Sequence, residues 1–315
     1  MRIVFMGTPD FAVPTLKQLI KKGHEVVGVI TQPDRPAGRG KKLTPSPIKV
    51  IAQNEGLFIY QPEKIRDPQA IESIKELQPD VIVVVAYGQI LPREILELPP
   101  FGAINVHASL LPKYRGAAPI HWAIINGEKK SGVTTMLMEE GLDTGPMLLK
   151  EEVKINPQMT TGELHDQLAL LGGELLVQTL DKLILGQIEP EPQDDNLSNY
   201  APLLKKEHEK IDWQQSKERI HNLIRGMNPW PGAYTFFKDI RLKIWGTTLA
   251  EYPAPESKIA GAIINLAEEG FWVQTGTEPI LITKVQPAGK NMMTAVSFIN
   301  GYGVEKGHFL GDQHE

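Results

Sequence analysis

The sequence predicts an α/β chain in which a doubly wound, mostly parallel sheet is followed by a small all-β domain. Runs rich in β-branched residues, at 2–6, 25–31, 57–60 and 80–86, alternate with helical patterns near 11–22, 46–55 and 68–78. Beyond residue 226 this alternation gives way to short strand-like runs at 233–237, 240–250, 259–266, 271–275 and 279–285. We therefore expect a Rossmann-like first domain and a C-terminal OB-like β-barrel.

The remaining elements follow from the same patterns. A strand is expected at 102–106, a helix from about 117, strands at 131–138 and 147–153, and an amphipathic helix over roughly 160–185. The polar, proline-containing stretch EPEPQDDNLSNYAPLL has the composition of a linker, and a helix is expected at about 214–226. The predicted division is a catalytic domain over 1–188, a linker over 189–205 and a barrel domain over 206–315.

Composition excludes several classes of function. The 315 residues include no cysteine, and none of the eight histidines lies in an HExxH motif, so we expect neither disulfides, thiol catalysis nor a metal site. The net charge of −5 disfavours a wholly basic nucleic-acid binder. The apolar run VIVVVA is far shorter than the roughly 18 residues that a membrane span needs. The N-terminus lacks a signal-peptide layout, so we expect no membrane contact and a cytoplasmic location.

Polar residues follow the strands at the edge where open parallel sheets bind ligands. Gly7-Thr8-Pro9-Asp10 follows the first strand, Ala86-Tyr87-Gly88-Gln89 follows the fourth, and Asn105 and His107 end the fifth. Strand alternation puts Asn105 and His107 on one face, so both can point at one reacting atom. A turn-capping Asn and a His bonded to backbone carbonyls would explain the pair equally well. The dinucleotide fingerprint G-x-G-x-x-G is absent, which disfavours a nicotinamide cofactor.

Asp143 completes a candidate catalytic set. It lies in the glycine-bracketed turn EEGLDTGPMLL between two predicted strands. An Asp in such a turn usually serves the backbone, but beside Asn105 and His107 it adds a carboxylate to an amide and an imidazole. These groups suit acyl transfer through a tetrahedral intermediate. No G-x-S-x-G elbow accompanies them, so the substrate must bring its own nucleophile.

At these residues the sequence resembles a known family. NVHASLLPKYRGAAP and GLDTGPML resemble the paired signature of the 10-formyltetrahydrofolate-dependent formyltransferases. More narrowly, MGTPDFAVPTL, TQPDRPAGRGKKLTPSPIK, VVVAYGQILP and IRGMNPWPGAY are similar to the members that formylate methionyl-tRNA. The similarity runs through both predicted domains.

The resemblance implies a reaction and roles for the catalytic set. The α-amine of methionine on initiator tRNA would attack the formyl carbon of 10-formyltetrahydrofolate, giving N-formylmethionyl-tRNA for translation initiation. Asn105 would hold the developing oxyanion, His107 would donate to the same oxygen, and Asp143 would orient His107 and assist proton movement. The folate cosubstrate would contact two loops and the apolar wall beside them, through Ser109, Leu110, Leu111, Pro112, Gln89, Ile90 and Leu142.

The resemblance also implies how tRNA is bound. The basic loop at about 32–45 would enter the end of the acceptor stem, with Arg39 as the leading candidate beside Arg35, Lys41 and Lys42. The barrel would add a basic stripe drawn from Lys206, Lys210, Arg225, Arg241 and Lys243. Nothing in the sequence demands an oligomer, and we expect a monomer.

The tryptophans Trp213, Trp230 and Trp245 are expected to pack in the core.

Two alternatives remain at this point. One is a formyltransferase for another amine, such as a glycinamide nucleotide or an amino sugar, which the basic loop and the barrel disfavour. The other is a protein that binds the tRNA acceptor stem without catalysis. Intact Asn105, His107 and Asp143 disfavour it, because a binding module needs no such set.

Overall fold

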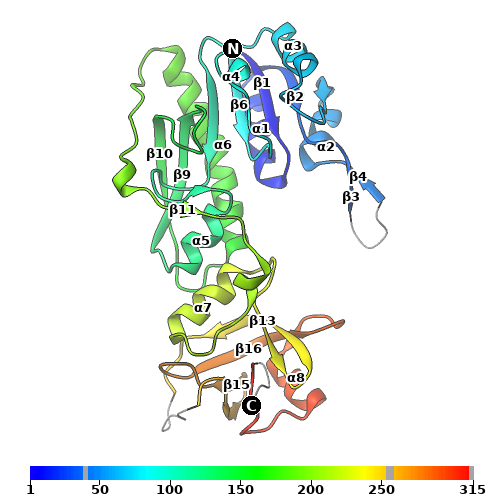
Figure 1. Ribbon diagram of the computed structural model, residues 1–315, viewed down its shortest axis with the longest axis vertical. Coiled ribbons are helices and arrows are strands. Elements are labelled where there is room, and N and C mark those ends of the chain that lie inside the picture. Colours follow the sequence, from blue (N-terminus) through cyan, green and yellow to red (C-terminus); the bar gives the residue numbers. More distant parts are fainter. Residues whose placement is uncertain (38–41, 253–258, 312–315) are drawn as a thin grey trace. The chain divides into compact units, whose positions relative to one another are not determined.

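The computed structural model describes residues 1–37, 42–252 and 259–311 and separates the chain into two compact units (Figure 1). Unit 1 comprises Met1–Pro119, Ser131–Val153 and His165–Ala201, and unit 2 comprises Ile120–Lys130, Lys154–Leu164 and Pro202–Glu315.

The helices and strands follow one another in the predicted order, with several short additions. The elements up to residue 160 are β1 (Arg2–Gly7), η1 (Asp10–Ala12), α1 (Val13–Lys21), β2 (Glu25–Ile30), β3 (Arg35–Ala37), β4 (Lys42–Thr44), α2 (Pro47–Asn54), β5 (Ile59–Tyr60), α3 (Pro68–Glu76), β6 (Val81–Val85), α4 (Arg93–Leu96), β7 (Ala103–His107), β8 (Arg115–Gly116), α5 (Pro119–Ile125), β9 (Lys130–Leu137) and β10 (Met147–Lys154). The later elements are α6 (Thr161–Ile184), η2 (Asp195–Leu197), β11 (Tyr200–Ala201), η3 (Lys206–Glu209), α7 (Lys217–Gly226), β12 (Tyr234–Phe237), β13 (Ile240–Thr248), β14 (Ile263–Ala267), β15 (Gly270–Val273), β16 (Ile280–Pro287), β17 (Met293–Thr294) and α8 (Ala295–Tyr302).

Unit 1 is built on a seven-stranded sheet in the order β10-β9-β7-β6-β1-β2-β5. β1 pairs in parallel with β2 and β6, β6 with β7, and β2 with β5, whereas β9 runs antiparallel to β7. All five residues of β6 are buried, as expected for a strand covered on both faces. The predicted mostly parallel, doubly wound sheet is therefore confirmed. The strand order reverses between β1 and β6, and the carboxyl ends of these strands and of β7 define the ligand-binding edge.

Helices cover the sheet because side chains alternate along its strands. Val4 and Met6 of β1 are buried in one cluster with Ile74 of α3 and Ile95 of α4.

Elsewhere in unit 1, two glycines let α6 approach its neighbours closely. A Cβ on Gly172 would lie 2.8 Å from Val106 Cγ1, and one on Gly173 would lie 3.1 Å from the carbonyl oxygen of Pro14. Alanine at either position would therefore push α6 away from β7 or α1.

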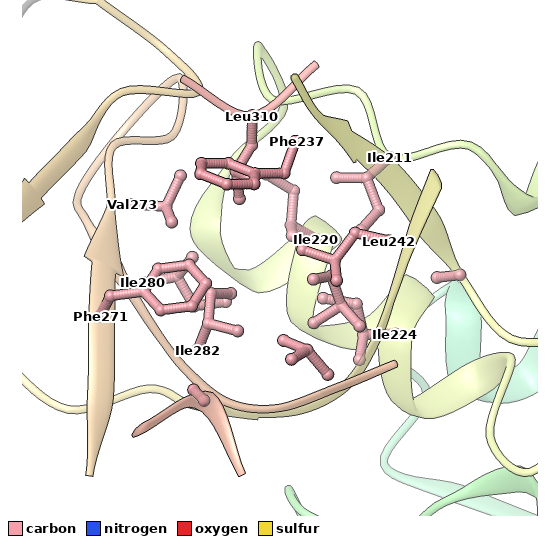
Figure 2. Close-up of a cluster of buried hydrophobic side chains, with 14 of the residues drawn as sticks. Ile211, Ile220, Ile224, Phe237, Leu242, Phe271, Val273, Ile280, Ile282 and Leu310 are labelled. Carbon is pink, nitrogen blue, oxygen red and sulfur yellow. The ribbon is translucent and has the colours of Figure 1, made fainter. Parts of the chain in front are cut away.

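Unit 2 contains the second core, which lies inside an antiparallel sheet in the order β12-β13-β16-β15-β14. Figure 2 shows Ile220 and Ile224 of α7 directed toward Leu242, Ile280 and Ile282 of the strands. The two edges of this sheet are joined through the chain's last described residues. Ile263 N donates to His308 O at 2.7 Å, and Gly311 N donates to Phe236 O at 2.9 Å. The expected small barrel is confirmed as this antiparallel sheet, joined at its edges by residues 307–311.

Candidate active site

The three predicted catalytic side chains come from one strand end and one connection in unit 1. Asn105 and His107 lie at the end of β7, and Asp143 lies in the connection between β9 and β10. Asp143 has a φ of +52°, a left-handed conformation that Asp tolerates better than most residues. Its carboxylate oxygen Oδ2 accepts the backbone N–H of Gly116 at 2.8 Å. The structure thus ties the Asp143 loop to the loop that follows β7.

The structure brings Asn105, His107 and Asp143 together. Asn105 Nδ2 donates to Asp143 Oδ1 at 3.4 Å, and His107 Nδ1 lies 3.7 Å from Asp143 Oδ2. The side chains of His107 and Asp143 are only 6% and 14% exposed. An amide donor, an imidazole and a carboxylate therefore converge in a largely desolvated place, where each interaction with a developing charge is stronger than in water.

The ring of His107 is oriented by a backbone carbonyl. His107 Nε2 lies 2.9 Å from the carbonyl oxygen of Tyr114, which can only accept a hydrogen bond. Nε2 therefore carries a proton, and in the neutral ring Nδ1 is the unprotonated nitrogen. This unprotonated nitrogen faces Asp143. The arrangement lets Nδ1 receive a proton and return it without any rotation of the ring.

The predicted folate loop is held by its own side chains and by β9. Ser109 Oγ donates to Lys113 O at 2.6 Å, and Thr134 Oγ1 donates to Ser109 O at 2.7 Å and accepts from Leu111 N at 3.1 Å. The Leu111 side chain is buried against Met136 and Met147. Leu110 and Pro112 are only partly covered. These last two residues are the ones whose side chains a ligand can reach most directly.

The other predicted folate residues divide into two kinds. The Gln89 side chain is committed to the backbone before α3: its Oε1 accepts from Ile65 N at 2.8 Å and its Nε2 contacts Pro62 O at 3.4 Å. Ile90 and Leu142, by contrast, are 78% and 57% exposed. Gln89 therefore supports the fold, and Ile90 and Leu142 are the apolar groups open to a ligand.

A cavity that the sequence did not reveal lies beside these two residues in the chain. It has a volume of about 410 Å³ and is lined by Arg93, Leu96, Glu97, Met138, Glu139, Glu140 and Gly141. Its walls come from α4 and from the start of the β9–β10 connection. The sequence gives little indication of α4, because this helix is only four residues long and no side chain caps its N-terminus. Ile90 and Leu142 each lie within three residues of this lining in the sequence.

The basic loop after β2 contains a two-stranded hairpin formed by β3 and β4, which extends outward from the sheet of unit 1 (Figure 1). Arg35 and Lys42 lie on its strands and are exposed, and Arg35 pairs with Thr44 in register. Arg39 and Lys41 lie outside the described residues. Lys49, also in the basic stretch, forms an ion pair with Asp34 at 2.7 Å, which anchors the base of the hairpin.

Of the basic residues predicted to bind tRNA on the barrel, one is buried and two are bonded to other residues of the chain. Arg225 is buried: its guanidinium donates to Met159 O at 2.9 Å, and burial lowers its pKa. The side chain therefore braces α7 inside unit 2. Arg241 pairs with Glu209 at 3.0 Å, and Lys243 donates to Pro231 O at 2.6 Å. Lys206 is exposed at the start of η3.

Two of the three tryptophans pack as predicted. Trp213 and Trp245 are buried, whereas Trp230 is 44% exposed, so the prediction of core packing was wrong for Trp230. It lies in a turn between Pro229 and Pro231, and its ring contacts that of His121 edge to face at 5.6 Å. Across the described ranges there is no group of three His, Cys, Asp or Glu side chains placed to hold a metal ion. The described helices likewise include none long and apolar enough to cross a membrane.

Comparison with known proteins identifies the family to which the chain belongs. Residues 1–180 match the family model described as formyl transferase, and residues 203–303 match the formyl transferase C-terminal domain. The chain is 52% identical over 311 residues to a protein named methionyl-tRNA formyltransferase from Moorella thermoacetica, covering 99% of each chain. It is 50% identical over 311 residues to the protein of that name from Clostridioides difficile, covering 99% of this chain and 100% of that one.

Solved structures show the same fold at low identity. HypX from Aquifex aeolicus in complex with tetrahydrofolic acid has a TM-score of 0.65 at 17% identity, over 99% of this chain and 51% of that one. The methionyl-tRNA formyltransferase from Clostridium thermocellum has a TM-score of 0.55 at 17% identity, over 79% of this chain and 94% of that one. At such identities the likeness concerns the fold alone.

Proposed function

The chain belongs to the formyltransferase family, and from that premise we propose that it transfers the formyl group of 10-formyltetrahydrofolate to the α-amine of methionyl-tRNA. Relatives about half identical over nearly the whole chain bear the name of this activity. The observation that carries the proposal is the convergence of Asn105, His107 and Asp143 at the carboxyl edge of the sheet. No protein nucleophile is needed, because the amine of the acceptor attacks.

The residues beside the site fit a folate. A flat heterocycle needs an apolar slot with a few directed polar groups. Leu96 and Met138 give the cavity two apolar walls, whereas the rest of its lining is largely charged, with Arg93, Glu97, Glu139 and Glu140. Exposed Ile90 and Leu142, with Leu110 and Pro112, would extend these walls. When bound there, 10-formyltetrahydrofolate supplies the formyl carbon that the amine attacks.

The three side chains divide the chemistry. Asn105 donates its amide hydrogen to the oxygen on which negative charge develops. His107, held by Tyr114 O, accepts the proton from the attacking amine at Nδ1 and in its protonated form adds a second donor to the oxyanion. It returns this proton to the folate nitrogen as the bond between that nitrogen and the formyl carbon breaks, which leaves the formyl group on the amine. Asp143 stabilises the charged ring from 3.7 Å. Because the Gly116 N–H already fixes one of its oxygens, the carboxylate is preorganised for this role.

Recognition of tRNA uses basic residues of both units. We assign the acceptor end to Arg35 and Lys42 of the β3–β4 hairpin together with Arg39 and Lys41, and a second contact to Lys206. The natural acceptor is the initiator methionyl-tRNA, the enzyme acts as a monomer, and the reaction takes place in the cytoplasm where charged tRNA is used. In this proposal the catalytic domain ends near residue 188 and the tRNA-binding domain begins near 206.

The test is an acceptor comparison with the purified protein. Labelled formyl transfer from 10-formyltetrahydrofolate is measured with methionyl-tRNA, with glycinamide ribonucleotide and with an amino-sugar nucleotide. The proposal predicts transfer to methionyl-tRNA alone. Transfer only to a small amine would leave the catalytic set in place and overturn the tRNA roles. No transfer to any acceptor, by a protein that binds methionyl-tRNA, would favour a binding protein without catalysis.

A further inference from the structure

The segment that follows α6 runs back across both loops of the candidate site. We call residues 191–201 the strap. At its start, Glu191 and Met147 exchange two backbone hydrogen bonds of 2.8 Å. At its end, β11 pairs in parallel with β8, and Asn199 O accepts from Arg115 N at 3.0 Å. The strap, part of the stretch predicted as a linker, is therefore bonded to the loop after β7 and to the first residue of β10.

Within the strap, Gln193 reaches the catalytic loop. Its Nε2 donates to Asp143 O and to Gly145 O, both at 2.8 Å. Its Oε1 accepts from Arg115 Nε at 3.0 Å, and Arg115 in turn pairs with Asp195 at 2.8 Å. Both amide hydrogens and the amide oxygen are thus engaged. Gln193 is also half-buried in a run whose neighbours on either side are exposed.

The two carbonyls that Gln193 holds belong to Asp143, whose backbone is left-handed, and to Gly145. Asp143 has its φ at +52°, which most residues other than glycine avoid, and it lies between Gly141 and Gly145 in a connection with little side-chain packing of its own. A backbone of this kind keeps one conformation only where the surroundings fix it. The amide of Gln193 supplies two hydrogen bonds at this place, one to Asp143 itself and one two residues later.

The strap also contacts the loop that follows β7, at Gly116. A Cβ on Gly116 would lie 2.5 Å from Tyr200 Cε2 and 2.9 Å from Ala201 O, so only glycine lets the strap come this close. Gly116 N donates to Asp143 Oδ2, and Arg115 beside it bonds Gln193. The Gln193 side chain therefore links the backbone of Asp143 to Arg115, which precedes the glycine whose N–H binds the Asp143 carboxylate.

We propose that Gln193 is a positioning residue for formyl transfer, holding the Asp143 carboxylate against Asn105 and His107 through the strap. The inference rests on the proposed function. It assigns no contact with substrate to Gln193, and it makes residues 191–201 a structural part of the active site. An error of about 1 Å in the place of a catalytic group costs on the order of 10²-fold in rate.

Two substitutions test this without removing bulk. Gln193→Glu keeps the length and the acceptor for Arg115 but replaces the donor amide, whereas Gln193→Met removes all three hydrogen bonds without adding charge. The matched control is Gln187→Glu, the same change at an exposed position just after α6. For each protein, kcat and KM are measured for both substrates across pH, together with the melting temperature.

We expect both Gln193 variants to lose about 10- to 100-fold in kcat, with KM for methionyl-tRNA and for the folate within about twofold of wild type. We also expect the pH dependence of kcat to move, because the spacing of Asp143 and His107 changes, while Gln187→Glu behaves as wild type. Wild-type kcat in both variants, or a loss fully explained by raised KM or by unfolding, would overturn the inference. Because the wild-type protein is assayed alongside, its failure to formylate methionyl-tRNA would instead count against the proposed function.

Discussion

At the scale of single residues, Asn105 has the most direct role. Its amide is a donor at the place where we expect the oxyanion, and removal of one such donor typically lowers kcat by about 10²–10³-fold. Asn105→Ala should therefore show a loss of this size in steady-state formyl transfer, with little change in KM for methionyl-tRNA. Asn265→Ala, on β14 of unit 2, is the control and should leave both constants unchanged. An Asn105→Ala protein within a few-fold of wild type would disprove the oxyanion role.

Tyr87, unlike Asn105, has a buried polar group to which we assign no role in formyl transfer. Its backbone carbonyl accepts from Thr8 Oγ1 at 2.9 Å, but its hydroxyl finds no hydrogen-bond partner among the described residues. Burial raises the pKa of this hydroxyl, so it stays neutral. An unsatisfied buried hydroxyl costs about 1–3 kcal/mol. Tyr87→Phe should thus leave formyl transfer unchanged and raise the free energy of unfolding in denaturant titrations by about 1 kcal/mol. A clear loss of stability would show that the hydroxyl is bonded.

At the scale of elements, α7 depends on a neutral histidine. His221 Nε2 lies 2.9 Å from Pro157 O, and Nδ1 lies 2.7 Å from Thr247 Oγ1. The carbonyl needs a donor, so Nε2 carries the proton and Nδ1 accepts from the threonine. Burial is the main cause that lowers the pKa of His221 below its ordinary 6.5. Protonation would reverse the bond to Thr247, because Nδ1 would then donate to the hydroxyl, and it would place a positive charge in a buried position near Arg225.

This arrangement predicts a pH dependence of stability. Between the lowered folded pKa and 6.5, the unfolded chain binds a proton at His221 that the folded chain does not. The free energy of unfolding should therefore fall as pH drops below about 6.5. Chemical denaturation of wild type and His221→Gln between about pH 5 and 7.5 measures this contribution. The variant should show a shallower dependence, and equal slopes would contradict the assignment.

The sequence predicted elements well where burial alone shapes them. β6 is recognisable because five β-branched residues follow one another before a turn, and β7 because Ile104 and Val106 alternate with two polar residues. Asn105 and His107 could be placed on one face from the alternation, and Asp143 from its glycine-bracketed turn. Gln193 could not, because its partners are 48 and 50 residues away and the composition around it is that of a linker. Arg225 was misplaced for a similar reason: its carbonyl partner at Met159 is 66 residues away.

The sequence also failed to predict short elements and the pairing at the edges of the barrel sheet. The β3–β4 hairpin has three residues on each strand and includes Pro36, so no alternation marks it. The segment 307–311 joins the barrel's edges through backbone hydrogen bonds, which leave no pattern in the side chains. Physical periodicity identifies long buried elements, whereas pairings made by a few backbone groups require the tertiary structure.

At the scale of the whole molecule, recognition of tRNA should depend on salt in proportion to the basic residues that bind phosphate. Removing one such residue should lower the slope of log affinity against log salt by about one. The double variant Arg35→Ala/Lys42→Ala should raise KM for methionyl-tRNA and reduce this slope, while kcat at saturation stays near wild type. Lys75→Ala, at an exposed position of α3, is the control for loss of a surface charge outside the hairpin. An unchanged slope in the hairpin variant would remove the hairpin from the interface.

In the function proposed here, one site in unit 1 carries out formyl transfer to methionyl-tRNA. The most direct measurement is the single-turnover rate of formyl transfer by wild type and Asp143→Asn, with tRNA binding measured separately. Asn tolerates the left-handed backbone at this position, so the fold should persist. We predict rapid transfer by wild type, a loss of at least about 10²-fold in the variant, and unchanged binding of methionyl-tRNA. A variant rate within a few-fold of wild type would contradict the account.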